Sequence, residues 1–239
     1  MKKIESFNFQ EGDRIYNKYE IIELLGDGWQ GEVYLVREIS TGIERAAKFF
    51  FPHRNKYGRT SKLYAKKLHK LKNCGLLIQY YGQDTLFIDG QEVVFLISEY
   101  IEGEILSEYL KRQSGNRLNP FTALHLLHAL AKGMEAVHRM KEYHGDLHTD
   151  NIIVERSGLS FQLKVLDLFN WGRASGENIH HDVVDMINVF YEVLGGKKHY
   201  ANLPDEIKDI CGGLKKSLIL KKFNTAGKLR GYIENMEWK

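Results

Sequence analysis

Cysteine and proline are scarce in this 239-residue sequence, which has two cysteines and three prolines. Cys74 and Cys211 offer no metal-binding spacing and are too few for a disulfide framework. We therefore expect reduced thiols and a cytoplasmic protein. Because prolines are few and no run is rich in serine and glycine, the sequence leaves little room for a disordered tail.

Long apolar runs are missing too. No stretch approaches the roughly 18 consecutive apolar residues of a membrane-spanning helix, so we expect no membrane span. The opening residues, MKKIESFNFQ, have the charges of a signal peptide without the apolar stretch that should follow them. Hydrophobic residues make up 43% of the chain and charged residues 27%, which is ordinary for a soluble globular protein. The net charge of +3 selects no class of partner.

Short strands are expected in the first hundred residues, because apolar segments rich in Val, Ile, Phe and Tyr alternate there with glycine or polar turns. The expected strands are Tyr19–Leu25, Val33–Glu38, Glu44–Phe51 and Val93–Tyr100. Between them, Leu63, Leu68 and Leu71 recur at roughly helical spacing and predict a helix over Ser61–Lys72.

Helical patterns dominate from Ile105 onward. The expected helices are Ile105–Arg112, Phe121–Lys141, 181–194, 205–220 and 225–236, with a strand-loop-strand block at 143–168. We therefore predict an α+β fold with two lobes, residues 1–100 forming a sheet with one helix and residues 101–239 a mainly helical lobe. The lobes would join near 99–104, and a cleft between lobes is a usual place for a ligand.

A glycine-rich segment separates the first two expected strands. Residues 25–33, LGDGWQGEV, have the pattern G-x-G-x-x-G-x-V, in which Gly26, Gly28 and Gly31 would let backbone N–H groups approach phosphates. A dinucleotide-binding fingerprint shares this pattern but needs a helix straight afterwards, whereas Val33–Val36 continues as a strand. A glycine-rich hairpin without a ligand is the alternative.

Lys48 ends the next strand, after Ala46 and Ala47. A lysine in this place can project its ammonium group into the cleft and pair with the α and β phosphates of a nucleotide. Taken singly it would be an ordinary charge at a strand end. Its position after the glycine-rich segment favours the phosphate interpretation.

Three polar side chains in the second half could perform and assist phosphoryl transfer. In residues 144–151, HGDLHTDN, Asp146 can accept or orient the proton of an attacking hydroxyl and Asn151 can bind a metal. Asp167 ends an apolar strand and suits Mg²⁺, which prefers one or two carboxylates together with substrate oxygens. For His144 and His148 the alternatives are core packing or zinc, although no third zinc ligand has sensible spacing.

These segments, in this order, resemble the protein kinase superfamily over nearly the whole chain. HGDLHTDN stands where the family has H-R-D-L-x-x-x-N, Asp167 stands at the D-F-G aspartate, and 96–103 looks like the hinge, with Ser98 as gatekeeper. The resemblance implies a bilobal kinase fold with an antiparallel N-terminal sheet. It also implies ATP and Mg²⁺ as cofactors and transfer of the γ-phosphate to protein Ser/Thr.

The same resemblance implies roles for particular residues. Asp146 and Lys48 would be catalytic, and Asn151 and Asp167 would bind the metal. The residues implied in ATP binding are Leu25, Gly26, Gly28, Gly31, Val33, Ala46, Lys48, Glu99 and Ile101.

One departure from the family concerns Lys48. The family's helix carries a glutamate that pairs with the strand lysine, yet no acidic residue occurs between Arg45 and Gln83. Ala65 or Lys66 falls near the expected place. Another acid could orient Lys48, the helix could sit differently, or the enzyme could be weakened.

Other departures concern regulation and the acceptor. Gly145 replaces the family's arginine before the catalytic aspartate, and the interval from Asp167 to Asp182 is short and lacks A-P-E. We therefore expect no switching by activation-loop phosphorylation. The triplet Asp167–Phe169 also lacks the family's glycine. His148 replaces the family's lysine, and HGDLH resembles the aminoglycoside and choline kinases. A small hydroxylated acceptor, or a nucleotide-binding pseudokinase that serves as an interaction module, therefore remains open beside a protein substrate.

A basic run without an acidic neighbour covers 54–72. Its members are Arg54, Lys56, Arg59, Lys62, Lys66, Lys67, Lys70 and Lys72. A solvated helix face is the first interpretation. Docking of an acidic protein is the functional one, and binding there would weaken with salt; nucleic acid is not the expected partner.

Overall fold

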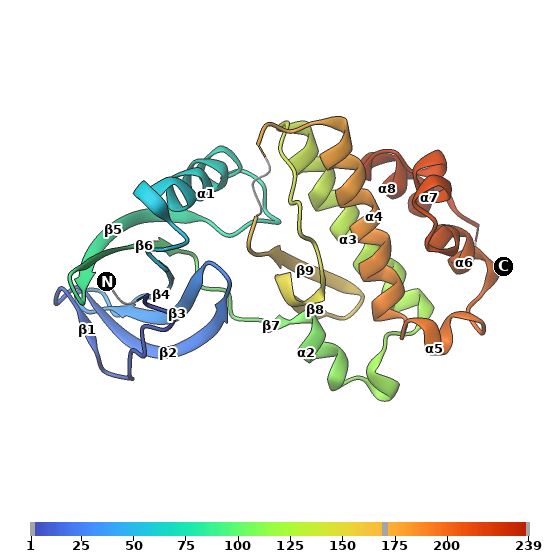
Figure 1. The fold of residues 1–239 in the computed structure, drawn as a ribbon. Helices are drawn as coiled ribbons and strands as arrows, with labels where there is room; N and C mark the ends of the chain where they lie inside the picture. Colours follow the sequence, from blue (N-terminus) through green and yellow to red (C-terminus); the bar gives the residue numbers. More distant parts are fainter. Residues whose placement is uncertain (1–2, 169–171, 238–239) are drawn as a thin grey trace. The chain divides into compact units, whose positions relative to one another are not determined.

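The computed structural model describes residues 3–168 and 172–237. The chain divides into two compact units (Figure 1). The first comprises Met1–Lys72 and Ile78–Ile101, and the second comprises Asn73–Leu77 and Glu102–Lys239. Within the described ranges, no helix is long and apolar enough to cross a membrane. Phe169, the third residue of the triplet Asp167–Phe169, lies outside the described residues.

The described part of the first unit contains a six-stranded sheet in the order β1-β2-β3-β4-β6-β5, and every pairing in it is antiparallel. Its strands are β1 Arg14–Ile15, β2 Tyr19–Gly28, β3 Gly31–Glu38, β4 Glu44–Phe50, β5 Tyr80–Ile88 and β6 Gln91–Ser98. The four expected strands are present. The sequence analysis missed β5, an edge strand whose Gly82, Gln83 and Asp84 have low strand propensity.

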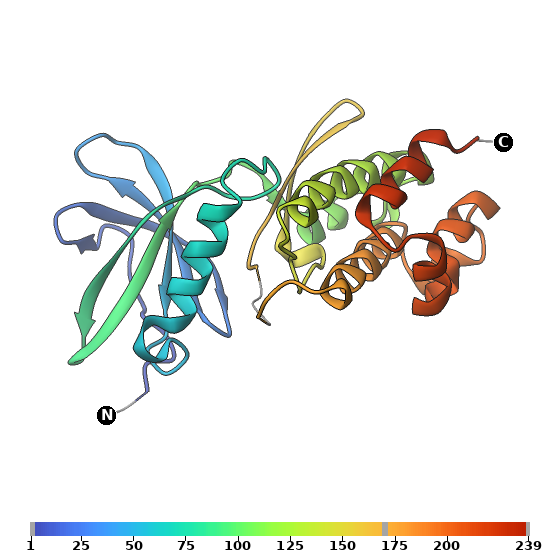
Figure 2. The ribbon, with the colours of Figure 1, turned by 90° about the horizontal axis from the view of Figure 1, so that it is seen from above.

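Both faces of this sheet are covered, one by the N-terminal segment and the other by a helix. Successive side chains of β4 point to opposite faces, so the strand contributes to both. Ala47 and Phe49 are buried in one cluster with Ile4 and Phe7 of the N-terminal segment. The other face packs against helix α1, Arg59–Lys70, which contacts β5 and β6 (Figure 2). The buried face of α1 includes Tyr64 rather than the expected Leu63, which is 49% exposed.

A buried carboxylate fixes the N-terminal segment to the sheet. Glu32, which is 4% exposed, accepts hydrogen bonds from the backbone N–H of Phe7 at 3.1 Å and from the hydroxyl of Tyr34 at 2.5 Å. Burial and this carboxylate together raise the pKa of the Tyr34 hydroxyl, which therefore stays protonated and donates. The strand that follows the glycine-rich segment is thus anchored at its start.

The second unit is mainly helical. Its helices are α2 Leu106–Lys111, α3 Pro120–Arg139, α4 Gly176–Val193, α5 Lys197–Tyr200, α6 Asp205–Cys211, α7 Lys216–Lys222 and α8 Ala226–Asn235. Helix α3 contacts α4, α8 and the small sheet, so it forms the centre of the unit (Figure 1). That sheet has the order β7-β8-β9, with strands Glu104–Ile105, Ile152–Ser157 and Ser160–Val165.

The single helix expected at 205–220 is wrong. The structure has α6 and α7 separated by Gly212 and Gly213, whose φ angles of 54° and 59° lie in the left-handed region. Such angles cost glycine little and are a common way to end a helix.

Candidate active site

One buried carboxylate organises the loop that contains Asp146. Asp182 of α4 is 0% exposed. Its Oδ2 accepts the backbone N–H of His144 and its Oδ1 accepts that of Gly145, each at 2.8 Å. The Nε2 atom of His138 lies 2.9 Å from Oδ2. Gly145 has a φ of 87°, a conformation that favours glycine where the family has arginine.

His144 connects this loop to the end of β9. Its Nε2 lies 2.7 Å from the carbonyl oxygen of Leu166, so Nε2 is the donor. Its Nδ1 then accepts the backbone N–H of Asp146 at 3.3 Å. His144 is fully buried, which agrees with the core interpretation. No group of three His, Cys, Asp or Glu able to hold a metal is found among the described residues, so nothing supports a zinc site there.

Asn151 closes the arrangement. Its side-chain Nδ2 donates to the carbonyl oxygen of Asp146 at 2.9 Å, and its backbone carbonyl accepts the N–H of Leu166 at 2.8 Å. Asp167 therefore follows directly after a residue tied to both His144 and Asn151. Asp167 has a φ of 54°, a conformation that is costly for a residue other than glycine and often marks a functional site. The structure thus brings Asp146, Asn151 and Asp167 together within the second unit.

His148 lies among the same polar groups. Its Nε2 is 2.8 Å from Nδ2 of Asn151 and 4.0 Å from Oδ2 of Asp146, and its Nδ1 is 3.7 Å from Oδ2 of Asp150. Because the Nδ2 group of Asn151 can only donate, Nε2 of His148 is the acceptor in that contact. The histidine in the place of the family's lysine therefore belongs to the Asp146 loop rather than to the core.

A second contact between a histidine and a carboxylate lies one turn further along α4. Nδ1 of His181 is 2.9 Å from Oδ2 of Asp185. Burial raises the pKa of the Asp185 carboxyl, and the nearby imidazole opposes that rise. The same helix therefore carries one fully buried carboxylate, Asp182, and one partly buried carboxylate, Asp185.

In the first unit, the strand register brings Val33, Ala46 and Lys48 to one face of the sheet. Lys48 is 8% exposed, and its Nζ lies 5.1 Å from the centre of the Tyr64 ring and 5.7 Å from that of Phe50. Sequence reasoning missed Tyr64. Its spacing with Leu68 and Leu71, four and seven residues on, could have placed it on the buried face of the helix.

The three glycines between β2 and β3 have different surroundings. A Cβ atom on Gly31 would overlap the carbonyl oxygen of Phe49, so this glycine is required by the packing of β3 on β4. Around Gly26 and Gly28 a Cβ atom would meet nothing within 4 Å. Space is therefore open beside the two glycines that the sequence assigns to phosphates. Leu25, the first residue of this segment, is 41% exposed.

At the expected hinge, Glu99 is tied to Gln79. The backbone N–H of Glu99 donates to the carbonyl of Gln79 at 2.8 Å, and its carboxylate accepts the Gln79 N–H at 3.0 Å. Ser98 is 8% exposed and its hydroxyl lies 3.5 Å from the carbonyl oxygen of Ala46. Ile101 is the last residue of the first unit.

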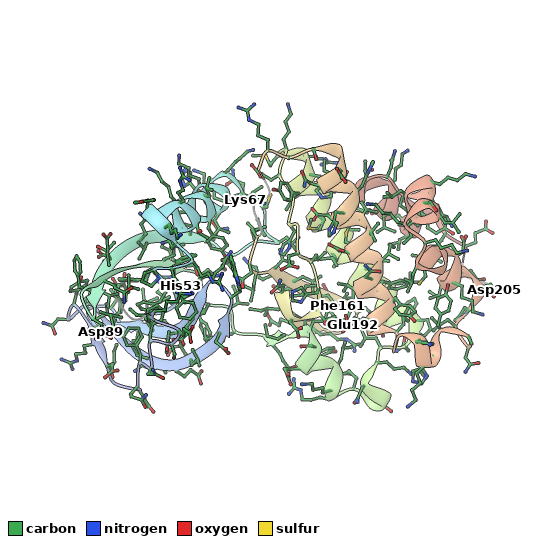
Figure 3. All side chains as sticks on the ribbon, in the orientation of Figure 1. His53, Lys67, Asp89, Phe161, Glu192 and Asp205 are labelled. Atoms are coloured by element: carbon green, nitrogen blue, oxygen red, sulfur yellow. The ribbon has the colours of Figure 1, made fainter. Side chains whose placement is uncertain are left out.

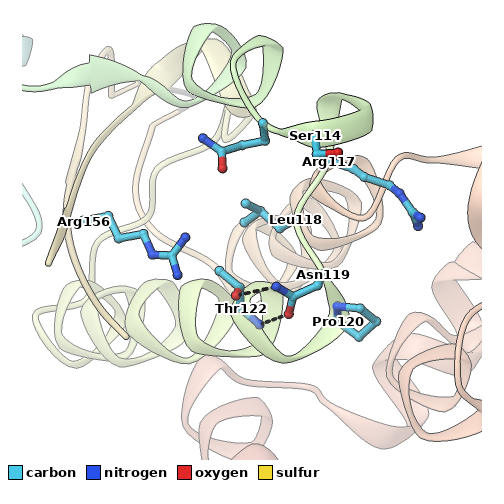
Figure 4. A pocket seen from close by; sticks show the side chains of 8 residues that line it. Ser114, Arg117, Leu118, Asn119, Pro120, Thr122 and Arg156 are labelled. Atoms are coloured by element: carbon cyan, nitrogen blue, oxygen red, sulfur yellow. Dashed lines mark hydrogen bonds between the residues drawn. The ribbon is translucent and has the colours of Figure 1, made fainter. Parts of the chain in front are cut away.

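A separate pocket of about 280 Å³ lies in the second unit (Figure 4). Its lining residues are Gln113, Ser114, Arg117, Leu118, Asn119, Pro120, Thr122 and Arg156. Asn119 caps α3 there by accepting the Thr122 N–H at 2.9 Å, and Arg156 donates to the carbonyl of Gly158 at 2.9 Å. None of the residues expected in catalysis lines this pocket.

Comparison with known proteins identifies the family of the chain. A model described as the protein kinase domain matches residues 19–202. The chain therefore belongs to the protein kinase family, and the resemblance noted in the sequence is confirmed.

Bacterial kinases are among its relatives. A Streptomyces coelicolor protein named as a probable serine/threonine-protein kinase is 27% identical over 174 residues, which are 71% of this chain and 24% of that protein. Serine/threonine-protein kinase PrkC of Bacillus subtilis is 26% identical over 160 residues, which are 65% of this chain and 23% of PrkC. The chain thus spans about a quarter of the length of these relatives.

The fold is also that of a solved kinase domain. The crystal structure of the PknI kinase domain from Mycobacterium tuberculosis matches with a TM-score of 0.68 and 16% identity, covering 95% of this chain and 99% of that one. The expected kinase fold, with an antiparallel N-terminal sheet and a mainly helical C-terminal part, is confirmed.

Replacing Asp182 with alanine should destabilise the protein, because the N–H groups of His144 and Gly145 would lose their acceptors inside the core. We expect a loss of about 3–5 kcal/mol in the free energy of unfolding, measured by denaturant titration. Asp182→Asn keeps one oxygen acceptor and should lose less. Asp205→Ala is the control, since that side chain is 99% exposed. Equal stability of Asp182→Ala and the control would contradict the anchoring role.

Proposed function

We propose that this chain is an ATP- and Mg²⁺-dependent kinase that transfers the γ-phosphate to Ser or Thr hydroxyls of proteins. The observation that carries the proposal is the hydrogen-bond network from Asp182 through His144 and Asn151, which gathers Asp146, Asn151 and Asp167 in a chain of the protein kinase family. Its kinase relatives support Ser/Thr as the acceptor.

The residues fit Mg²⁺ and a nucleotide. Nδ2 of Asn151 is engaged with Asp146, which leaves Oδ1 as the atom suited to a metal, and Asp167 supplies a carboxylate. Mg²⁺ prefers such oxygens together with phosphate oxygens. The open space at Gly26 and Gly28 suits the close approach of a triphosphate to backbone N–H groups. When bound, the metal would neutralise charge on the phosphates.

Each side chain then has one task. Asp146, whose carboxylate is exposed while its backbone is held at both ends, would orient the substrate hydroxyl and receive its proton. Lys48 would bind the α and β phosphates. The apolar side chains Leu25, Val33 and Ala46 would pack against the adenine, and backbone atoms of Glu99 and Ile101 would hydrogen-bond to it. Positioning of this kind supplies much of the rate in phosphoryl transfer.

We also propose a cytoplasmic location. Cys74 and Cys211 are free and buried, and burial raises the pKa of the Cys211 thiol to about 12. Both thiols would therefore stay protonated and unreactive, as suits a reducing compartment.

An acidic protein segment is the partner we propose for the basic helix. Lys62, Lys66 and Lys70 are exposed on α1. They line a groove of about 580 Å³ together with Ala65, His69, Tyr80 and Gln83. Lysine stems and a tyrosine offer apolar surface beneath a row of positive charges, which is complementary to a segment that alternates acidic and apolar residues.

Asp146→Asn should abolish phosphate transfer while ATP still binds, because the amide occupies the same space but cannot accept the hydroxyl proton. We expect a loss of roughly 10²-fold to 10⁴-fold in transfer from γ-labelled ATP to a generic protein substrate. Asp150→Asn, in the same loop, is the control and should keep most of the rate. Full transfer by Asp146→Asn would remove its assigned role.

Two other results of that assay would redirect the proposal. Release of ADP that requires Asp146 but labels no protein would favour a small hydroxylated acceptor, as HGDLH suggests. Bound ATP with neither label nor ADP would favour a nucleotide-binding pseudokinase.

Charge reversal of Lys62, Lys66 and Lys70 to glutamate should weaken binding of a labelled peptide of alternating glutamate and leucine. Fluorescence anisotropy at low and raised salt measures this, and both charge reversal and salt should lower the affinity. The control reverses Lys215, Lys216 and Lys221, which are exposed in the second unit. If both triple variants bind the peptide like the unaltered protein and transfer phosphate normally, the docking surface is excluded.

A further inference from the structure

The helix that faces Lys48 offers it no carboxylate. In protein kinases a glutamate on this helix pairs with the strand lysine and holds it in place. Here α1, RTSKLYAKKLHK, contains no acid, and none occurs anywhere from Arg45 to Gln83. Lys67, labelled in Figure 3, even adds a buried cation to the inward face of α1. Any hold on Lys48 from this helix must therefore be of another chemical kind.

Two aromatic rings stand next to the Lys48 ammonium group. Its Nζ lies 5.1 Å from the centre of the Tyr64 ring and 5.7 Å from that of Phe50. The two rings contact each other edge to face, with centres 6.3 Å apart and planes at 65°. A cation within about 6 Å of a ring centre is attracted to the negative face of the ring, and the attraction grows when water is excluded. Lys48 and Tyr64 are each only 8% exposed.

The position of Tyr64 is itself well fixed. At the start of α1, the side chain of Asn55 accepts the N–H of Ser61 at 3.1 Å and donates to its hydroxyl at 3.0 Å. One turn after Tyr64, Leu68 is buried and anchors the helix on the sheet. Helix α1 is therefore fixed both before and after Tyr64, which fixes the position of the ring. A residue that positions another needs such support.

We propose that Tyr64 is the positioning residue for Lys48, and that its ring takes the place of the missing helix carboxylate, with Phe50 as a second support. This inference rests on the proposed function, in which Lys48 binds the α and β phosphates. A ring holds the ammonium group without neutralising it.

The first test asks whether the Lys48 side chain contacts the Tyr64 ring in the protein without nucleotide. Protons next to a ring face experience a ring-current shift, so the ε-CH₂ protons of Lys48 should resonate upfield of those of exposed lysines. Replacing Tyr64 with phenylalanine should preserve this shift, whereas Tyr64→Leu should reduce it to the smaller part that Phe50 contributes. An unshifted Lys48 signal in the unaltered protein would overturn the proposal.

The second test asks whether the ring at position 64 positions Lys48 for ATP binding, and it uses the whole chain. Phenylalanine and 3,4,5-trifluorophenylalanine at position 64 have nearly the same size, but fluorination cancels the negative ring face. The protein with trifluorophenylalanine should bind ATP roughly threefold to thirtyfold more weakly than the protein with phenylalanine, measured by calorimetry with Mg²⁺. The melting temperatures of the two proteins should be the same. In a Lys48→Met background the two residues should give equal affinity, because the partner of the ring is gone.

A matched control lies in the same sheet. The Arg45 guanidinium stacks over the ring of Tyr81 at 4.3 Å, and Tyr81 is 51% exposed. The same fluorinated residue at Tyr81 should leave ATP affinity unchanged. Equal ATP affinity of the phenylalanine and trifluorophenylalanine proteins at position 64, in a chain that binds ATP, would overturn the positioning role alone. A chain that binds no ATP in any form would overturn the proposed function with it.

Discussion

The hydrogen bonds that the Asp182 carboxylate accepts are the constraint on which the loop containing Asp146 depends. A buried carboxylate is costly unless its oxygens are satisfied, and here the N–H groups of His144 and Gly145, each 2.8 Å away, satisfy them together with His138. If the loop moved away from α4, both the buried carboxylate and the two N–H groups would lose their hydrogen-bond partners. The free-energy cost of that loss fixes the loop on α4. From this anchor, His144 and Asn151 transmit the geometry to Asp146 and to the end of β9. The Asp146 side chain is exposed while the hydrogen bonds of its N–H and carbonyl groups fix its backbone.

The first unit solves a different electrostatic problem. Lysine at the end of a buried strand needs a polar or charged neighbour, and this family supplies one from a helix. In this chain the helix is basic, and Lys48 lies against Tyr64 and Phe50. The negative face of an aromatic ring attracts a nearby cation, and it does so more strongly where water is excluded. Helix α1 thus contains no acidic residue, and it places Lys62, Lys66 and Lys70 on its exposed face and Tyr64 on its buried face.

Ordered motifs such as LGDGWQGEV and HGDLHTDN allowed the sequence to predict the kinase fold, which is confirmed, and they supply the proposed site residues. The sequence was less informative where tertiary contacts decide. Strand β5 is an edge strand of low propensity, and only its pairing with β6 makes it a strand. The break between α6 and α7 depends on two glycines at positive φ, and the helical period alone does not reveal it. Tyr64 could be placed on the buried face, but its contact with Lys48 depends on the packing of α1 on the sheet.

The most direct measurement is a crystal structure of the whole chain with Mg²⁺ and a non-hydrolysable ATP analogue. The account predicts a Mg²⁺ ion coordinated by the Asp167 carboxylate and by Oδ1 of Asn151 at about 2.0–2.1 Å, with the γ-phosphate facing Asp146. Nδ2 of Asn151 should keep its hydrogen bond to the Asp146 carbonyl. A metal bound without either of these oxygens, or a nucleotide bound away from Asp146, would contradict the account.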